Sequence, residues 1–144
     1  MLAFFVREPQ LKEFMQHLFT HDTFCSFETR GVVVQSFVSF EISESNSSWE
    51  EIRPYVRNIL KGRERPRAMK FVFAFAEPET LHQNAAALFI NMTYESGEGD
   101  KDSKMNFTTA TSQKQFELDK SLDRQWDEWV TEFFRQKGIE TEVQ

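Results

Sequence analysis

Apolar residues in the first part of the chain shift from strand spacing to helix spacing. Residues 2–6, "LAFFV", form a short apolar run that predicts a strand. Pro9 suits the first turn of a helix, where its missing N–H has no intrahelical partner to lose. Apolar side chains then recur at intervals of three and four residues, at Leu11, Phe14, Met15, Leu18 and Phe19. This spacing predicts an amphipathic helix that begins near Pro9.

Between residues 24 and 42 the apolar positions return to the spacing of strands. The tripeptide Thr29-Arg30-Gly31 is typical of a turn, because glycine adopts positive φ at no steric cost. From 32 to 42 the even positions are mostly apolar and the odd positions are mixed. We therefore predict a hairpin in which a strand over 24–29 pairs with a half-buried strand over 32–42.

A second helix is predicted to begin with a first turn at residues 49–53 and to continue from residue 54. Ser48 and Glu51 have the spacing of a capping box, and Gly62 would end the helix. Pro54 removes an internal hydrogen bond, so we expect a kinked or restarted helix there. Its buried face is expected to contain Ile52, Tyr55 or Val56, Ile59 and Leu60.

The second half of the chain predicts three strands and a long helix. "MKFVFAFAE" (69–77) is apolar on both faces and is placed centrally in a sheet. Residues 87–95 and 105–112 alternate and give two further strands. A helix follows with apolar residues at Leu122, Trp126, Trp129, Val130, Phe133 and Phe134. Gly138 is the expected C′ residue, with Ile139 packing back in a Schellman arrangement.

This order of elements, β-α-ββ-α-βββ-α, predicts an α+β fold. We expect one domain over residues 1–144, a two-layer sandwich with a mostly antiparallel sheet of about five to six strands. Helices would cover mainly one face of that sheet. The predicted core contains Phe14, Leu18, Val38, Phe40, Phe73, Ile90 and Trp126.

Three stretches of the sequence resemble an uncharacterised protein family from Firmicutes, mostly clostridia. These are residues 7–24, 48–75 and 109–129, roughly half of the chain. The specific patterns are Trp49…Arg53-Pro54…Lys61-Gly62…Pro66 and Leu118-Asp119-Lys120-Ser121-Leu122-Asp123…Trp126-Asp127. The resemblance implies a single-domain protein and no particular activity. The element order is also loosely similar to one domain of sliding DNA clamps, from which the last helix departs.

Charge is distributed unevenly along this chain, whose net charge is −6. Residues 53–70 hold seven basic residues and one acid, whereas residues 117–144 hold eight acids and four bases. A solvated helix end is the favoured interpretation of the basic segment. The alternatives are docking on the acidic C-terminal helix of a second copy and weak nucleic-acid binding. The candidate contact residues are Arg53, Arg57, Lys61, Arg63, Arg65 and Arg67.

Residues with catalytic or metal-binding chemistry do not form a recognisable motif. His17 and His21 are four residues apart, but a zinc site needs three or four ligands. Cys25 lacks an evident base and orienting group, so a buried free thiol is favoured. Asp119 and the acids that follow it at helical spacing are typical of capping and solvation. We therefore predict no catalytic residue, no metal and no cofactor.

These observations favour a binding or structural module over an enzyme. Arg7 and Glu8 interrupt the apolar N-terminus, and no apolar run approaches the roughly 20 residues of a membrane span, so we expect a cytoplasmic protein without membrane contact. The leading hypothesis is protein–protein contact or self-association. Weak nucleic-acid binding through the second helix is an alternative, which the net charge disfavours. The third hypothesis is an enzyme whose site is assembled across the fold.

Overall fold

The computed structural model describes residues 1–36, 38–43, 45–61, 66–97 and 103–144. Its elements follow the predicted order, with a short 3-10 helix added between the fourth and fifth strands and one short strand added at the end. They are β1 (Ala3–Arg7), α1 (Gln10–Phe19), β2 (Glu28–Gln35), β3 (Ser39–Ser43), α2 (Trp49–Leu60), β4 (Ala68–Ala74), the 3-10 helix η1 (Pro78–Thr80), β5 (Ala85–Glu95), β6 (Lys104–Gln113), α3 (Ser121–Gln136) and β7 (Glu142–Val143).

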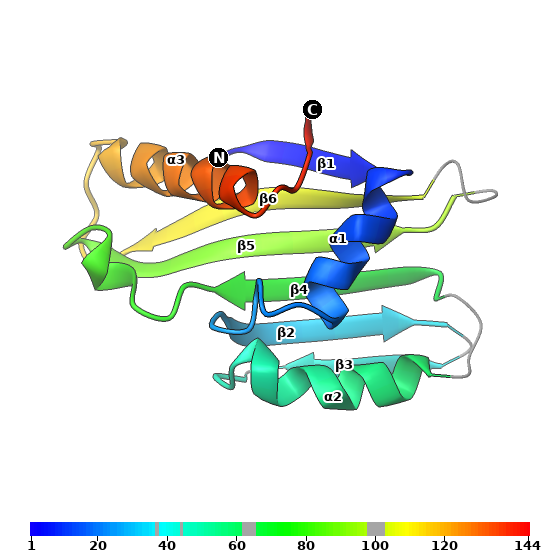
Figure 1. The fold of residues 1–144 in the computed structure, drawn as a ribbon. Coiled ribbons are helices and arrows are strands. Elements are labelled where there is room, and N and C mark those ends of the chain that lie inside the picture. Colours follow the sequence, from blue (N-terminus) through cyan, green and yellow to red (C-terminus); the bar gives the residue numbers. More distant parts are fainter. Residues whose placement is uncertain (37, 44, 62–65, 98–102) are drawn as a thin grey trace.

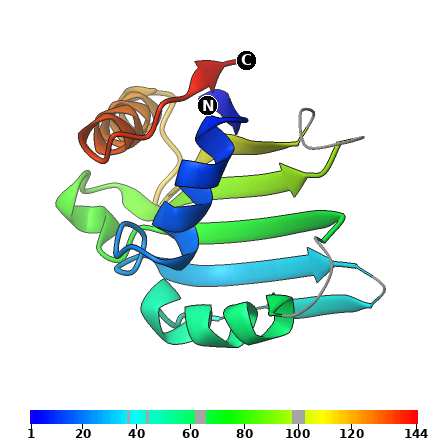
Figure 2. The same cartoon turned by 45° about the vertical axis from the view of Figure 1, so that its right-hand side comes forward.

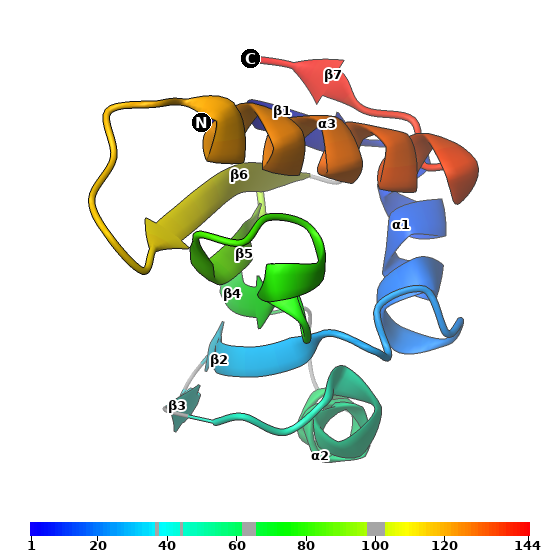
Figure 3. The ribbon, with the colours of Figure 1, turned by 90° about the vertical axis from the view of Figure 1, so that its left-hand side faces the viewer.

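The strands form one antiparallel sheet in the order β3-β2-β4-β5-β6-β1-β7. The three helices lie on one side of this twisted sheet (Figures 1 and 2). Seen from the end, α2 lies near β2 and β3, while α3 and β7 lie at the other end of the sheet (Figure 3). The α+β prediction is therefore confirmed, and the sheet has seven strands because β7 extends the β1 edge.

The core lies between the sheet and the helices and is rich in aromatic rings. The central strand β4 points Phe71 and Phe73 toward the helices, and both are fully buried. Phe73 stacks on Phe24 and contacts Trp49, with ring centroids 5.8 and 5.3 Å away. Burying one such side chain contributes about 1.5–3 kcal/mol. The many phenylalanines therefore fill the core without adding polar groups that need partners.

Most of the predicted core is confirmed, with one error. Phe14, Leu18, Phe73, Ile90 and Trp126 are buried, and Phe40 packs against the core from the sheet edge. Val38, however, is 62% exposed. It lies between β2 and β3, where its carbonyl accepts a hydrogen bond from the Ser36 N–H, so the alternation that placed it inside stops there.

The predicted hairpin over 24–42 is wrong in its boundaries. β2 begins at Glu28, runs through Gly31 and pairs with β3, and the turn lies after Gln35. On its other side β2 pairs with β4, with a register shift between Thr29 and Gly31. Thr-Arg-Gly therefore marks a β-bulge inside a strand, which is a common use of glycine in strands.

Local signals predicted the helix ends better than they predicted the hairpin. The Ser48 hydroxyl accepts a hydrogen bond from the Glu51 N–H, which confirms the N-cap of α2. The helix runs through Pro54 without a restart. The carbonyl that loses its partner there belongs to Glu50, an exposed residue that water can reach. Gly62, the predicted end of this helix, lies outside the described residues.

The end of α3 also forms as predicted. Gly138 adopts a φ of 72° and its N–H donates to the Arg135 carbonyl. The Ile139 N–H donates to the Phe134 carbonyl, and Ile139 is buried. These two bonds define a Schellman motif. The motif turns the chain back toward β1, where β7 adds to the sheet.

Candidate functional site

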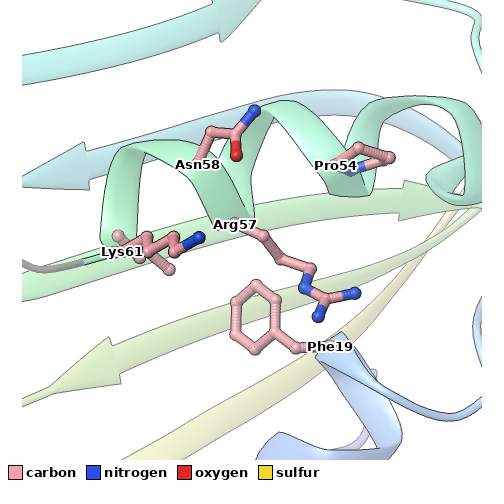
Figure 4. A pocket seen from close by; sticks show the side chains of 6 residues that line it. Phe19, Pro54, Arg57, Asn58 and Lys61 are labelled. Atoms are coloured by element: carbon pink, nitrogen blue, oxygen red, sulfur yellow. The ribbon is translucent and has the colours of Figure 1, made fainter.

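The candidate functional site is a pocket between the end of α1 and the outer face of α2, called here the α1–α2 pocket. Its volume is about 620 Å³. The described residues that line it are Phe19, Pro54, Arg57, Asn58, Leu60 and Lys61. Figure 4 shows Arg57 extending from α2 to the side of the Phe19 ring, with the Lys61 amine at the end of α2 on the same side of the helix. The pocket thus combines an apolar floor with two cations.

The helical repeat of α2 explains this grouping. Pro54, Arg57, Asn58 and Lys61 are spaced by three, one and three residues, so they form one stripe along the helix. The opposite side of the helix is held by buried Val56. The stripe can therefore stay exposed while the helix remains fixed to the sheet.

Phe19 forms the floor because it is the last residue of α1 and only half-buried. Its ring lies 5.9 Å from the Trp49 ring and 6.1 Å from the Phe71 ring. Trp49 is itself fixed, because its indole N–H donates to the Leu18 carbonyl over 2.6 Å. The floor of the pocket is therefore held by the core, and its position does not depend on a ligand.

Only part of the predicted basic surface lines this pocket. Arg57 and Lys61 do, but Arg53 points to the end of α1, where it donates to the His21 carbonyl over 2.5 Å. Its guanidinium also lies 3.9 Å from Asp22, and its side chain is only 13% exposed. Side chains four residues apart on a helix differ by about 40° in direction, so Arg53, Arg57 and Lys61 do not all point the same way. Arg53 is therefore a structural link between α1 and α2 and does not line the pocket.

The other predicted basic residues are dispersed. Arg63 and Arg65 lie outside the described residues. Arg67 is exposed at the start of β4, where its N–H donates to the Gln35 carbonyl. Lys70 alternates with the buried Met69 and Phe71, so it faces away from the helices. A continuous basic face is therefore not formed by the part of the basic segment that the structure describes.

The histidines near α1 do not assemble a metal site. The His17 and His21 rings are 5.3 Å apart, and His17 Nδ1 lies 2.7 Å from the Thr23 hydroxyl. Burial, followed by the nearby His21, lowers the pKa of His17. Within the described ranges, no three His, Cys, Asp or Glu residues are placed to hold a metal ion.

Cys25 was predicted to lie in a strand. It lies instead in the loop before β2. Its sulfur is 3.8 Å from an Asp22 carboxylate oxygen. Burial is the main cause that raises the pKa of this thiol, and the Asp22 charge adds to it. A raised pKa keeps the thiol protonated, which is the opposite of what a nucleophilic cysteine needs.

Sequence reasoning missed a hydrogen-bonded chain at the start of α3. The Asn84 N–H donates to His82 Nδ1, so the proton of the neutral ring is on Nε2 and faces the Ser121 hydroxyl at 3.2 Å. Ser121 in turn donates to Asp119, and this bond is the main cause of the lowered pKa of that carboxyl. His82 therefore cannot accept the Ser121 proton in this arrangement. The hydrogen bond from the Asn84 N–H holds the His82 ring in this position. No sequence motif indicated this arrangement.

The acids of α3 hold the helix on the sheet. Asp127 accepts a hydrogen bond from Thr109 over 2.5 Å, and Asp123 accepts one from Thr111. Thr109 and Thr111 are two residues apart on a strand, a rise of about 6.8 Å, and Asp123 and Asp127 are four apart on a helix, a rise of about 6 Å. The two spacings are similar, so both hydrogen bonds can form at once. Asp123 and Asp127 therefore link α3 to β6, whereas the sequence had suggested capping and solvation for the acids of this helix.

Taken together, fold and pocket define a two-layer α+β domain with a small basic and apolar pocket. A family model described as a family of unknown function (DUF5721) matches residues 6–142, so this chain belongs to that family. No curated protein and no solved structure shows a significant match to it. Across the described residues, the helices are too short or too polar for a membrane span.

Proposed function

We propose that this protein is a binding module that takes an acidic and partly apolar protein segment in the α1–α2 pocket. The observation that carries the proposal is the placement of Arg57 and Lys61 beside the half-buried Phe19 ring. Among the described residues, neither cation forms an ion pair with a carboxylate. They are placed to meet a negative charge that the ligand supplies.

The two kinds of contact are both needed for useful affinity. An exposed ion pair contributes only about 0–1 kcal/mol, because water and salt screen it. Apolar burial adds about 25 cal/mol for each Å² removed from water. A ligand with one aromatic or aliphatic side chain between two acids would use Phe19 and Leu60 as well as the cations. Purely anionic ligands would use the cations alone.

An acid–base enzyme is less well supported at this position. The described lining contains no carboxylate, histidine, serine or cysteine. Catalysis by proton transfer needs such a group within hydrogen-bond reach of the substrate. The lining supports recognition instead. The single cysteine, which is free, agrees with a proposed site of action in the reducing cytoplasm.

The proposal can be tested by NMR titration of the ¹⁵N-labelled protein with the peptide acetyl-Glu-Phe-Glu-amide. Saturable shift changes are expected at Arg57, Asn58 and Lys61, with weaker binding as salt rises. The matched peptide acetyl-Gln-Phe-Gln-amide should bind less well, since it keeps the ring and loses both charges.

The control protein carries Arg57→Gln and Lys61→Gln. Both residues are exposed, so the fold should persist while binding of the acidic peptide falls to the level of the neutral one. The proposal fails if the acidic peptide at about 5 mM, a concentration that would detect even millimolar affinity, leaves these resonances unmoved.

Nucleic-acid binding at the same pocket is the second candidate, because a cation pair beside an aromatic ring is also found where single strands stack. Three observations weaken it: Arg53 is used within the fold, Lys70 faces the other side of the sheet, and the net charge is −6. Anisotropy with labelled RNA and DNA at about 150 mM salt tests it, since non-specific phosphate contacts collapse with rising salt. Sub-micromolar binding that Arg57→Gln and Lys61→Gln abolish would favour nucleic acid over a protein segment.

A further inference from the structure

The segment between β6 and α3 displays two large apolar side chains to solvent. Phe116 and Leu118 are each 83% exposed. Glu117 and Asp119 alternate with them and are exposed as well. We call residues 114–120 the anchor segment. Single exposed apolar residues are common, but two on one short segment, interleaved with acids, form a distinct surface feature.

The anchor segment is held in place by side-chain amides. Asn84 donates to the Gln115 carbonyl over 2.9 Å and accepts from the Gln115 N–H over 3.0 Å. Gln113 does the same for Glu117, with distances of 3.3 Å to the carbonyl and 3.1 Å from the N–H. Each amide thus satisfies both main-chain groups of one residue, as a neighbouring strand would.

The ends of the anchor segment are also fixed. Lys114 forms an ion pair with Glu79 over 2.7 Å, and Asp119 accepts from the Ser121 N–H over 3.0 Å. Exposed apolar side chains on a fixed main chain lose less freedom when a partner covers them. Such preorganisation raises affinity without any new contact. The structure therefore presents Phe116 and Leu118 in the manner of interface anchors.

The anchor segment and the α1–α2 pocket are complementary in chemistry. The pocket offers apolar surface from Phe19 and Leu60, together with the Arg57 and Lys61 cations. The anchor segment offers an exposed aromatic ring next to the Glu117 carboxylate. Docking would therefore bring opposite charges together and cover apolar surface on both sides.

The two features cannot meet within one molecule. In Figures 1 and 3 the segment leading into α3 lies well away from α2, with β4 and β5 between them in the sheet. We propose that the anchor segment of one copy docks in the α1–α2 pocket of a second copy, which rests on the proposed function of that pocket. Because the two surfaces differ, the contact is head-to-tail, and repetition gives a ring or an open filament.

Complementation between two variants tests this proposal. The pocket variant carries Arg57→Glu and Lys61→Glu, and the anchor variant carries Phe116→Ser and Leu118→Ser. Sedimentation equilibrium over a concentration series should show self-association of the natural chain that weakens with salt. Each variant alone should associate at least about tenfold more weakly, as expected when interface anchors are removed.

A mixture of the two variants should form heterodimers that do not grow further. In that pair the intact anchor of the pocket variant meets the intact pocket of the anchor variant, and no second productive contact remains. Val38→Ser serves as the control for removing an exposed apolar side chain, and Lys12→Glu as the control for reversing an exposed charge. Both controls should associate like the natural chain, and circular dichroism should show all variants folded.

Other outcomes overturn the proposal in distinguishable ways. If acetyl-Glu-Phe-Glu-amide binds but the chain stays monomeric at every concentration, the pocket is a binding site and the second copy is not its ligand. A dimer that neither variant weakens, or that fails to reform in the mixture while each variant alone is monomeric, would also exclude head-to-tail docking. If neither the peptide nor a second copy binds, the pocket function itself fails.

Discussion

Thr109 on β6 forms side-chain hydrogen bonds both to the residue before β1 and to α3. Its hydroxyl accepts from the Leu2 N–H over 2.9 Å and donates to Asp127. The side chain is 1% exposed, so water cannot replace either bond. A buried polar group is favourable only while all of its partners remain satisfied.

Thr109→Val should therefore destabilise the protein by about 1–3 kcal/mol, because the shape is kept and the Leu2 N–H loses its partner. The matched control is Thr108→Val on the same strand, which faces away from the helices and should change stability by no more than about 0.5 kcal/mol. Urea denaturation of both variants measures the difference. Equal stabilities would show that the Thr109 hydroxyl is not a structural link.

Cys25 provides a second prediction at this scale. Its thiol pKa is raised by burial and by Asp22, so alkylation by iodoacetamide at about pH 8 should be slower than for a cysteine in a short peptide, whose pKa is about 8.5. Asp22→Asn removes one of the charges that raise the pKa, and the rate should then increase. Asp22 is 96% exposed, so the fold should not be affected. A natural thiol that reacts faster than the peptide would contradict the assigned environment.

At the scale of elements, signals confined to a few residues were predictable. The Ser48 cap and the Schellman motif at Gly138 each depend on backbone groups within six residues, and both formed. The boundaries of β2 were not predictable from pattern, because a bulge at Thr29–Gly31 looks like a turn in sequence. Only the pairing of β2 with β4, which is distant along the chain, distinguishes a bulge from a turn here.

Two glycines allow a matched test of backbone conformation. Gly138→Ala should cost about 1–2 kcal/mol, because the φ of 72° is strained for any residue with a Cβ although no atom lies within 4 Å of it. Gly31→Ala lies in a strand, where its Cβ would be 3.6 Å from the Ile42 carbonyl oxygen, an ordinary contact. It should be neutral or stabilising by up to about 1 kcal/mol. Thermal unfolding of the two variants measures the difference in stability. A Gly31→Ala variant less stable than the Gly138→Ala variant would contradict the assigned motifs.

For the molecule as a whole, the fold class followed from the sequence, and the pocket did not. The apolar alternation in strands and the apolar periodicity in helices are local signals. The α+β class, and the face of each element that points to the core, could therefore be inferred from the sequence. The α1–α2 pocket needs Phe19 beside Arg57, and these are brought together only by packing on Trp49 and Phe71. Arg53 instead donates to the His21 carbonyl after α1, which helical spacing alone could not indicate.

The aromatic core is expected to dominate global stability. Phe73 is fully buried among other rings, so Phe73→Ala should cost about 3–5 kcal/mol. Val38→Ala, at an exposed position, should stay within about 0.5 kcal/mol. Unfolding by guanidinium chloride measures the stability change of both variants. A loss below about 1 kcal/mol for Phe73→Ala would place this ring outside the core.

The most direct test of ligand recognition through Arg57 and Lys61 is a reversal of ligand preference. Calorimetric titration would compare acetyl-Glu-Phe-Glu-amide with acetyl-Lys-Phe-Lys-amide on the natural protein and on the protein carrying Arg57→Glu and Lys61→Glu. Because the ring contact is common to both peptides, the charges of the pocket should decide the preference. We expect the natural protein to bind the acidic peptide more tightly and the variant to bind the basic one more tightly. The same preference in both proteins would contradict recognition through Arg57 and Lys61.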